Sequence, residues 1–157
     1  AGVWIAGKNM IDKINSPYKA RFLDWELAGV NIEQEGILMA PTVAIPKLLE
    51  RNNLKYDDID LWEIHEAFAS QVLATIVKIE DKKHIKKLGI NFDFGKFPLE
   101  KLNPNGSSIA IGHPFGATGA RILSQTVKHL HNLGTNKKAI ISVCADGGLG
   151  AVVLVGN

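Results

Sequence analysis

The sequence predicts an α/β layer fold, and three observations support this prediction. Short apolar runs typical of strands alternate along the chain with stretches in which apolar residues recur at helical spacing. Turn-forming residues separate the two kinds of segment. The chain has 157 residues, of which 46% are hydrophobic, so it can bury one core. Because strands that alternate with helices bury their apolar faces in layers, we expect helices packed on a sheet rather than helices alone.

In the first half of the chain, imperfect alternation of apolar and polar residues predicts a strand over residues 20–28. Pro41 opens a helix that runs to about Asn52. Pro46 must fall in the first turns of this helix to be tolerated, because proline lacks the N–H that a helix interior needs. A second strand is predicted over residues 59–64, and a helix from Ala67 to about Glu80 follows it.

The second half is predicted to begin with a loop and to end with a helix and two strands. Glycines and prolines break up residues 89–104, which predicts a loop with one short helix at most. The next helix follows the turn at His113 and runs to about Leu133, where Gly134 provides a C-terminal cap. Strands near residues 138–144 and 149–155 close the domain.

His113 is the most informative single residue. It lies between glycine-flanked turns, close to the start of the helix that follows. The positive end of a helix disfavours the protonated imidazole, so His113 is suited to act as a neutral base or hydrogen-bond donor. The simpler alternative is that His113 only packs in a loop.

Two further segments carry a polar group at the edge of an apolar stretch. His65 lies where a strand pattern changes to a helical one, and Cys144 ends a buried-strand run just before a glycine-rich turn. Cys144 is the only cysteine, so it cannot form an internal disulfide and is either an inert apolar residue or a reactive thiol. Its position at a strand end favours reactivity, because chemistry often collects there.

In order and spacing, these residues resemble the three C-terminal motifs of thiolases, the acetyl-CoA acyltransferases. The resemblance extends roughly from Lys19 to the end of the chain. A histidine at position 65, where many biosynthetic thiolases have asparagine, is more similar to the fatty-acid-oxidation branch, the 3-ketoacyl-CoA thiolases. The matching segments are His65-Glu66-Ala67-Phe68, Gly112-His113-Pro114 with Gly116-Ala117-Thr118-Gly119, and Cys144-Ala145-Asp146-Gly147-Gly148-Leu149-Gly150.

The resemblance implies one half of a thiolase-like layered sandwich, with a mixed sheet flanked by helices. Residues 1–18 would be the remnant of the last strand and helix of the N-terminal domain, with the strand at residues 1–8, and residues 19–157 would be the C-terminal domain. The nucleophilic cysteine of the family lies in the N-terminal half. The chain therefore resembles a C-terminal fragment or one piece of a split protein, and we expect it to be inactive alone.

The implied reaction transfers an acyl group to coenzyme A, by thiolysis of a 3-ketoacyl-CoA or by the reverse Claisen condensation. The resemblance assigns His113 as the base for the missing cysteine and Cys144 as the acid/base for the acetyl-CoA enolate. It assigns His65 and His113 as donors to the enolate oxygen. Coenzyme A and acyl-CoA are then substrates, and no permanently bound cofactor is implied.

The resemblance also implies three substrate-binding residues, Phe68, Asp146 and Gly147. Phe68 belongs to the motif that neighbours the acyl site, and the backbone N–H two residues after Cys144 contributes to a second oxyanion site. Asp146 departs from the small residues usual there. Its carboxylate either opposes negative charge in the site, or turns outward and caps the N–H groups of the Gly147-Gly148 turn.

Composition limits the partners. A net charge of +2 gives no general case for a nucleic-acid or anionic-membrane surface, and four lysines around His84 are expected to form a solvated helix face. No apolar run reaches the roughly 20 residues of a membrane span, and no metal-ligand spacing is present.

Expected partners are acyl-CoA, the N-terminal half and further copies in a homo-oligomer. The C-terminal tripeptide does not match a peroxisomal address. We expect a cytoplasmic location, or the mitochondrial matrix in a eukaryote. The alternative function is a non-catalytic thiolase-fold module acting as an assembly partner.

Overall fold

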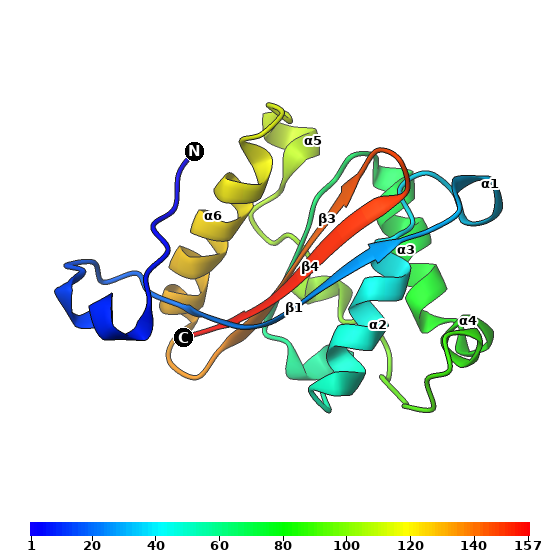
Figure 1. Cartoon of the computed structure of the whole chain (residues 1–157), viewed down its shortest axis with the longest axis horizontal. Helices are drawn as coiled ribbons and strands as arrows, with labels where there is room; N and C mark the ends of the chain where they lie inside the picture. Colours follow the sequence, from blue (N-terminus) through cyan, green and yellow to red (C-terminus); the bar gives the residue numbers. More distant parts are fainter.

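The computed structural model describes all 157 residues and confirms the predicted α/β fold with a mixed sheet (Figure 1). Four strands form the sheet in the order β1-β4-β3-β2. Strand β4 pairs antiparallel with both β1 and β3, whereas β2 pairs parallel with β3. The strands are β1 (Arg21–Gly29), β2 (Leu61–Ile64), β3 (Lys138–Ala145) and β4 (Leu149–Gly156).

Helices cover both faces of this sheet. Helices α2 and α3 pack on one face, and α6 packs on the other face against β2 and β3. The helices are α1 (Ile32–Glu35), α2 (Pro41–Arg51), α3 (Ala69–Glu80), α4 (Lys82–Lys87), α5 (Ser108–Ile111) and α6 (Thr118–Leu133), with 3₁₀ turns at Lys8–Lys13, Tyr56–Asp58 and Leu99–Lys101.

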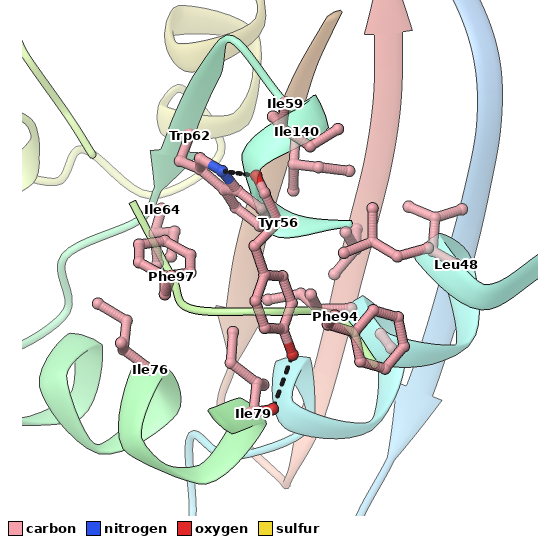
Figure 2. Close-up of a cluster of buried hydrophobic side chains, with 14 of the residues drawn as sticks. Leu48, Tyr56, Ile59, Trp62, Ile64, Ile76, Ile79, Phe94, Phe97 and Ile140 are labelled. Carbon is pink, nitrogen blue, oxygen red and sulfur yellow. Dashed lines mark hydrogen bonds between the residues drawn. The ribbon is translucent and has the colours of Figure 1, made fainter. Parts of the chain in front are cut away.

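The main core lies between the sheet and the α2–α3 layer, around Tyr56 and Trp62 (Figure 2). Both side chains are fully buried, and their rings lie edge to face with centroids 6.0 Å apart. The Tyr56 hydroxyl donates to the Ile79 carbonyl oxygen at 2.7 Å, and Trp62 Nε1 donates to the Tyr56 carbonyl oxygen at 3.3 Å. These bonds satisfy the polar atoms of two large aromatic residues inside an apolar core.

The predicted strands and long helices are confirmed to within a few residues. The loop predicted over residues 89–104 contains only one short 3₁₀ turn. Periodicity did not predict the single-turn helices α1 and α5, because four residues are too few to show a helical repeat. The four lysines around His84 are exposed on α4 as expected, but His84 itself is buried.

The expectation for Pro46 needs refinement. Pro46 is the sixth residue of α2 and lies inside the helix, beyond its first turn. A non-proline residue there would donate its N–H to the Thr42 carbonyl oxygen, four residues earlier. The His84 ring takes over this role, since its Nε2 lies 3.0 Å from that oxygen. A buried side chain from α4 therefore satisfies the acceptor that proline leaves open.

The strand predicted over residues 1–8 is wrong for this structure. Residues 1–7 have no regular structure, and the 3₁₀ turn Lys8–Lys13 follows them. Trp4 is 96% exposed. A strand needs a neighbouring strand for its backbone hydrogen bonds, and this segment pairs with none of the four strands.

Candidate active site

His65 lies directly after β2, where it is held by backbone and side-chain bonds. Its backbone N–H donates to the Ser142 carbonyl oxygen on β3 at 2.8 Å, so the parallel pairing continues to the histidine. On the other side of β2, the Ile64 N–H donates to Asn103 Oδ1 at 2.8 Å, and Asn103 Nδ2 donates to the Ile64 carbonyl oxygen at 2.9 Å. Asn103 thus replaces a neighbouring strand at this edge and fixes where β2 ends.

His113 lies in the turn between α5 and α6, as the glycine-flanked pattern predicted. Gly112 and Gly116 have φ values of 88° and 80°, which other residues rarely adopt. The His113 ring Nδ1 lies 2.6 Å from Oγ1 of Thr118, the first residue of α6. The turn therefore holds the imidazole against the start of the helix.

The structure brings His65 and His113 into contact. Their ring centroids are 4.3 Å apart, although 48 positions separate them in the sequence. His65 is buried and His113 is exposed. Burial, followed by the positive charges of His113 and Arg121, lowers the pKa of His65. His65 is therefore neutral at ordinary pH, and a neutral imidazole can still donate one hydrogen bond.

Several polar residues around the two histidines were missed in the sequence. The Ser108 hydroxyl lies 2.9 Å from His65 Nδ1, and Arg121 Nη2 donates to the same hydroxyl at 3.2 Å. Glu66 accepts from Asn103 Nδ2 at 2.8 Å and from the Ile109 backbone N–H at 3.2 Å. Glu66 directly follows His65 and Arg121 lies eight positions after His113, but the partners named here are 13 to 43 positions away, so no local pattern marks these pairings.

Cys144 lies on β3, the strand that neighbours β2. His65 directly follows β2, and Cys144 is the second-last residue of β3. Because the two strands are parallel, both residues lie at the carboxyl-terminal end of the strands. The thiol is buried, and burial raises its pKa. Cys144 therefore carries its proton at neutral pH, as a proton donor must. No hydrogen bond joins it to either histidine in this structure.

The three predicted substrate-binding residues are exposed near the same edge. Phe68 precedes α3 in an extended conformation and is 64% exposed. Asp146 and Gly147 occupy the turn between β3 and β4, and Asp146 Oδ1 accepts the Gly147 N–H at 2.7 Å. This geometry favours the capping alternative for Asp146 over a carboxylate that opposes the site. The Gly147 N–H already donates to the Asp146 carboxylate in this arrangement.

Three cavities of the chain do not coincide with this site. They have volumes of about 380–400 Å³ and are lined by other residues, and none includes His65, His113 or Cys144. The most apolar of them lies between residues 2–14 and α6. No group of three or more His, Cys, Asp or Glu residues is arranged to hold a metal ion. None of the helices has the length and apolarity to cross a membrane.

Comparison with known proteins identifies the family of this chain. The model of the thiolase C-terminal domain matches residues 16–157. The peroxisomal 3-ketoacyl-CoA thiolase of Saccharomyces cerevisiae is 38% identical over 98% of this chain and 32% of its own length. The 3-ketoacyl-CoA thiolase of Alteromonas mediterranea is 42% identical over 77% of this chain and 28% of its own length. The chain thus spans about a third of the curated relatives that it matches.

Solved structures give the same result. The human mitochondrial 3-ketoacyl-CoA thiolase superposes with a TM-score of 0.72 at 31% identity, over 97% of this chain and 34% of that one. The Acat5 thiolase of Ascaris suum, solved with coenzyme A, gives 0.69 at 28% identity over the same shares. The dimeric peroxisomal thiolase of Saccharomyces cerevisiae gives 0.66 at 37% identity, over 88% of this chain and 30% of that one.

The first of these relatives corrects one prediction. The expected cytoplasmic or mitochondrial location is contradicted, because the yeast relative, which matches 98% of the chain, is named as a peroxisomal protein. The motif residues carry no compartment signal, which is why they gave no guide to location. They do define the family: with a family model matched over residues 16–157 and a thiolase fold around the paired histidines, the chain belongs to the thiolases, as their C-terminal domain.

Proposed function

We propose that this chain supplies the C-terminal catalytic portion of a thiolase that transfers an acyl group to coenzyme A. The observation that carries the proposal is the contact between His65 and His113, with Cys144 at the end of the adjacent parallel strand. A pair of imidazole hydrogen-bond donors beside a protonated thiol is suited to stabilise and protonate an enolate. The names of the relatives support 3-ketoacyl-CoA as the substrate class.

In the proposed reaction, His113 and Cys144 transfer protons, and His65 and His113 stabilise the enolate. The nucleophilic cysteine of the N-terminal half, deprotonated by His113, attacks the 3-keto carbon, and the C2–C3 bond breaks to release the acetyl-CoA enolate. His65 and His113 donate hydrogen bonds to the enolate oxygen while Cys144 transfers its proton to C2. The Cys144 thiolate then takes the proton of coenzyme A, whose sulfur attacks the acyl-cysteine and releases the cysteine thiolate beside protonated His113.

The proposed partner is an N-terminal thiolase half that packs on the uncovered part of the sheet. Helix α6 covers β2, β3 and the Val155 end of β4 but leaves most of β1 uncovered on the same face. Trp25 and Leu27 on this part of β1 are 63% and 71% exposed. Residues 1–18 are assigned to the end of that N-terminal half. The dimer of the yeast relative supports an oligomeric complex, and the Ascaris suum structure supports coenzyme A as substrate.

The test is to reconstitute the activity. The chain alone should release no acetyl-CoA from acetoacetyl-CoA and coenzyme A, and co-expression with an N-terminal thiolase half should restore release. In that complex, Cys144→Ala should retain acylation of the nucleophilic cysteine but lose exchange of the acetyl-CoA α-protons, because only the enolate step uses this thiol. His113→Ala should impair both steps.

The control is His131→Ala, which removes an exposed histidine at the far end of α6 and should change neither step. Turnover by the chain alone would contradict the proposal. A stable complex that neither accepts an acyl group nor exchanges α-protons would support the non-catalytic assembly module instead.

A further inference from the structure

A short chain of hydrogen bonds leads away from His65 into the protein. Ser108 Oγ lies 2.9 Å from His65 Nδ1. Arg121 Nη2, from the first turn of α6, donates to Ser108 Oγ at 3.2 Å and to Ser107 Oγ at 3.3 Å. Ser107 and Ser108 are both buried. The His65 ring is thus joined through one hydroxyl to a permanently charged guanidinium.

The number of donors and acceptors determines which way these bonds run. A guanidinium can only donate, so Ser108 Oγ must accept from Arg121. A serine hydroxyl has one proton, and the only acceptor within hydrogen-bond distance of Ser108 Oγ is His65 Nδ1. If His65 Nδ1 carried a proton instead, it would also donate to Ser108 Oγ, and the hydroxyl proton would be buried without an acceptor. A buried hydroxyl proton without an acceptor is unfavourable.

We propose that Ser108 and Arg121 are positioning residues that fix His65 as the neutral tautomer protonated on Nε2. The proposal rests on the proposed function, in which His65 donates a hydrogen bond to the enolate oxygen. With Nδ1 committed to Ser108, Nε2 is the ring nitrogen left to face the site, and this tautomer places the proton there. The wrong tautomer would present a lone pair to a negative oxygen and would repel it.

The surrounding charges support the neutral form. His113, from the α5–α6 turn, and Arg121, from α6, both oppose a second proton on His65, and burial opposes it most. Glu66, the next residue along the chain, acts in the opposite direction. Both Glu66 oxygens are already engaged, by Asn103 Nδ2 and the Ile109 N–H, which limits its influence on the imidazole.

The tautomer can be read by ¹⁵N NMR of the chain labelled on its histidine rings. In the wild-type protein, His65 should show an unprotonated Nδ1 and a protonated Nε2 at pH 7 to 9. Ser108→Ala should move the Nδ1 signal toward the protonated position, because the donor that holds its lone pair is gone. Ser108→Thr keeps the hydroxyl and should restore the wild-type signals. Arg121→Met should raise the pKa of His65, so that its ring gains a second proton at a higher pH than in the wild type, because one of the positive charges that oppose this proton is gone.

Ser107→Ala is the matched control. It removes the other buried serine that Arg121 contacts but leaves the bond between Ser108 and His65, so the His65 signals should not change. A wild-type His65 protonated on Nδ1, or unchanged signals in Ser108→Ala, would overturn the proposal.

A kinetic measurement on the reconstituted enzyme separates this proposal from the proposed function. Ser108→Ala should lower kcat for α-proton exchange about tenfold with little change in KM, since the donor acts mainly in the transition state. Ser107→Ala and Ser108→Thr should stay within twofold of wild type. A matching loss of rate in Ser107→Ala would show that the effect is only structural. Failure of every protein to exchange protons would count against the proposed function while the NMR result stands.

Discussion

At the scale of single residues, Glu63 is the most unusual group in the chain. It lies on β2, two residues before His65, and its side chain is fully buried. Neither carboxylate oxygen has a hydrogen-bond partner. Burial, only partly offset by the charge of Arg121, raises the pKa of this carboxyl to about 7. Glu63 therefore gains a negative charge in an apolar surrounding as the pH rises through neutrality.

This raised pKa predicts a loss of stability at alkaline pH. In the unfolded chain the carboxyl has its ordinary pKa of 4.5, whereas in the folded chain its pKa is about 7. The folded state thus holds the proton more tightly, and its advantage is lost as the pH rises from 4.5 through 7. Between pH 5 and 8, the wild type should lose roughly 2 kcal/mol more unfolding free energy than Glu63→Gln, as measured by urea denaturation.

Glu100→Gln is the control, because Glu100 is an exposed carboxyl on the 3₁₀ turn Leu99–Lys101. Its pH dependence should follow that of the wild type. Parallel stability curves for the wild type and Glu63→Gln would show that Glu63 titrates near its ordinary pKa.

At the scale of elements, a side chain of α4 replaces a backbone hydrogen bond that α2 lacks. Pro46 removes a backbone donor inside α2, and His84 Nε2 lies 3.0 Å from the unpaired Thr42 carbonyl oxygen. Both Thr42 and His84 are buried. Since water cannot reach the carbonyl oxygen, the histidine is its only available donor.

His84→Ala should therefore cost about 1–3 kcal/mol of unfolding free energy, the range for a buried polar group left without a partner. Pro46→Ala returns a backbone N–H to the helix and can satisfy Thr42 directly. In the Pro46→Ala background, His84→Ala should cost clearly less, and a double-mutant cycle in urea measures this coupling. Lys86→Ala, on the exposed side of α4, should change stability by less than about 0.5 kcal/mol. Additive effects of the two substitutions would argue that His84 contributes through packing alone.

At the scale of the whole molecule, the sheet has one closed and one open edge. Asn103 pairs with Trp62 and Ile64 at the edge of β2. Strand β1 forms the other edge, spans nine residues and pairs only with β4. Its outward-facing Trp25 and Leu27 are exposed. A long edge strand with exposed apolar residues promotes association.

The chain without an N-terminal partner should therefore self-associate through β1. Trp25→Lys should shift sedimentation velocity profiles toward the monomer, because a charge on this face must be desolvated when two copies meet. Val77→Lys is the matched control on α3, where Val77 is 68% exposed, and should leave the profile unchanged. A wild-type monomer at all concentrations, or an equal effect of Val77→Lys, would exclude β1 as the associating surface.

The sequence by itself determined the α/β class, the four strands and three long helices of the core, and the family. These properties depend on local patterns: periodicity reports which faces are buried, and the motifs around His65, His113 and Cys144 stand in short continuous segments. The strand expected at residues 1–8 failed, although its composition is apolar. Its backbone bonds depend on a partner strand, and an apolar composition does not supply one.

Only the tertiary structure decided how the site is supported. The His65–Ser108 contact, the Arg121 bonds and the Thr42–His84 pairing each join residues 13 to 43 positions apart, so no local periodicity encodes them. The structure also decided the orientation of Asp146. The sequence left two orientations open, and in the folded chain Asp146 Oδ1 accepts the N–H of the adjacent Gly147. Hydrogen-bond partners are chosen by distance and burial in the folded chain. The sequence therefore identifies the candidate reacting residues, whereas the hydrogen-bond partners that set their protonation are known only from the folded structure.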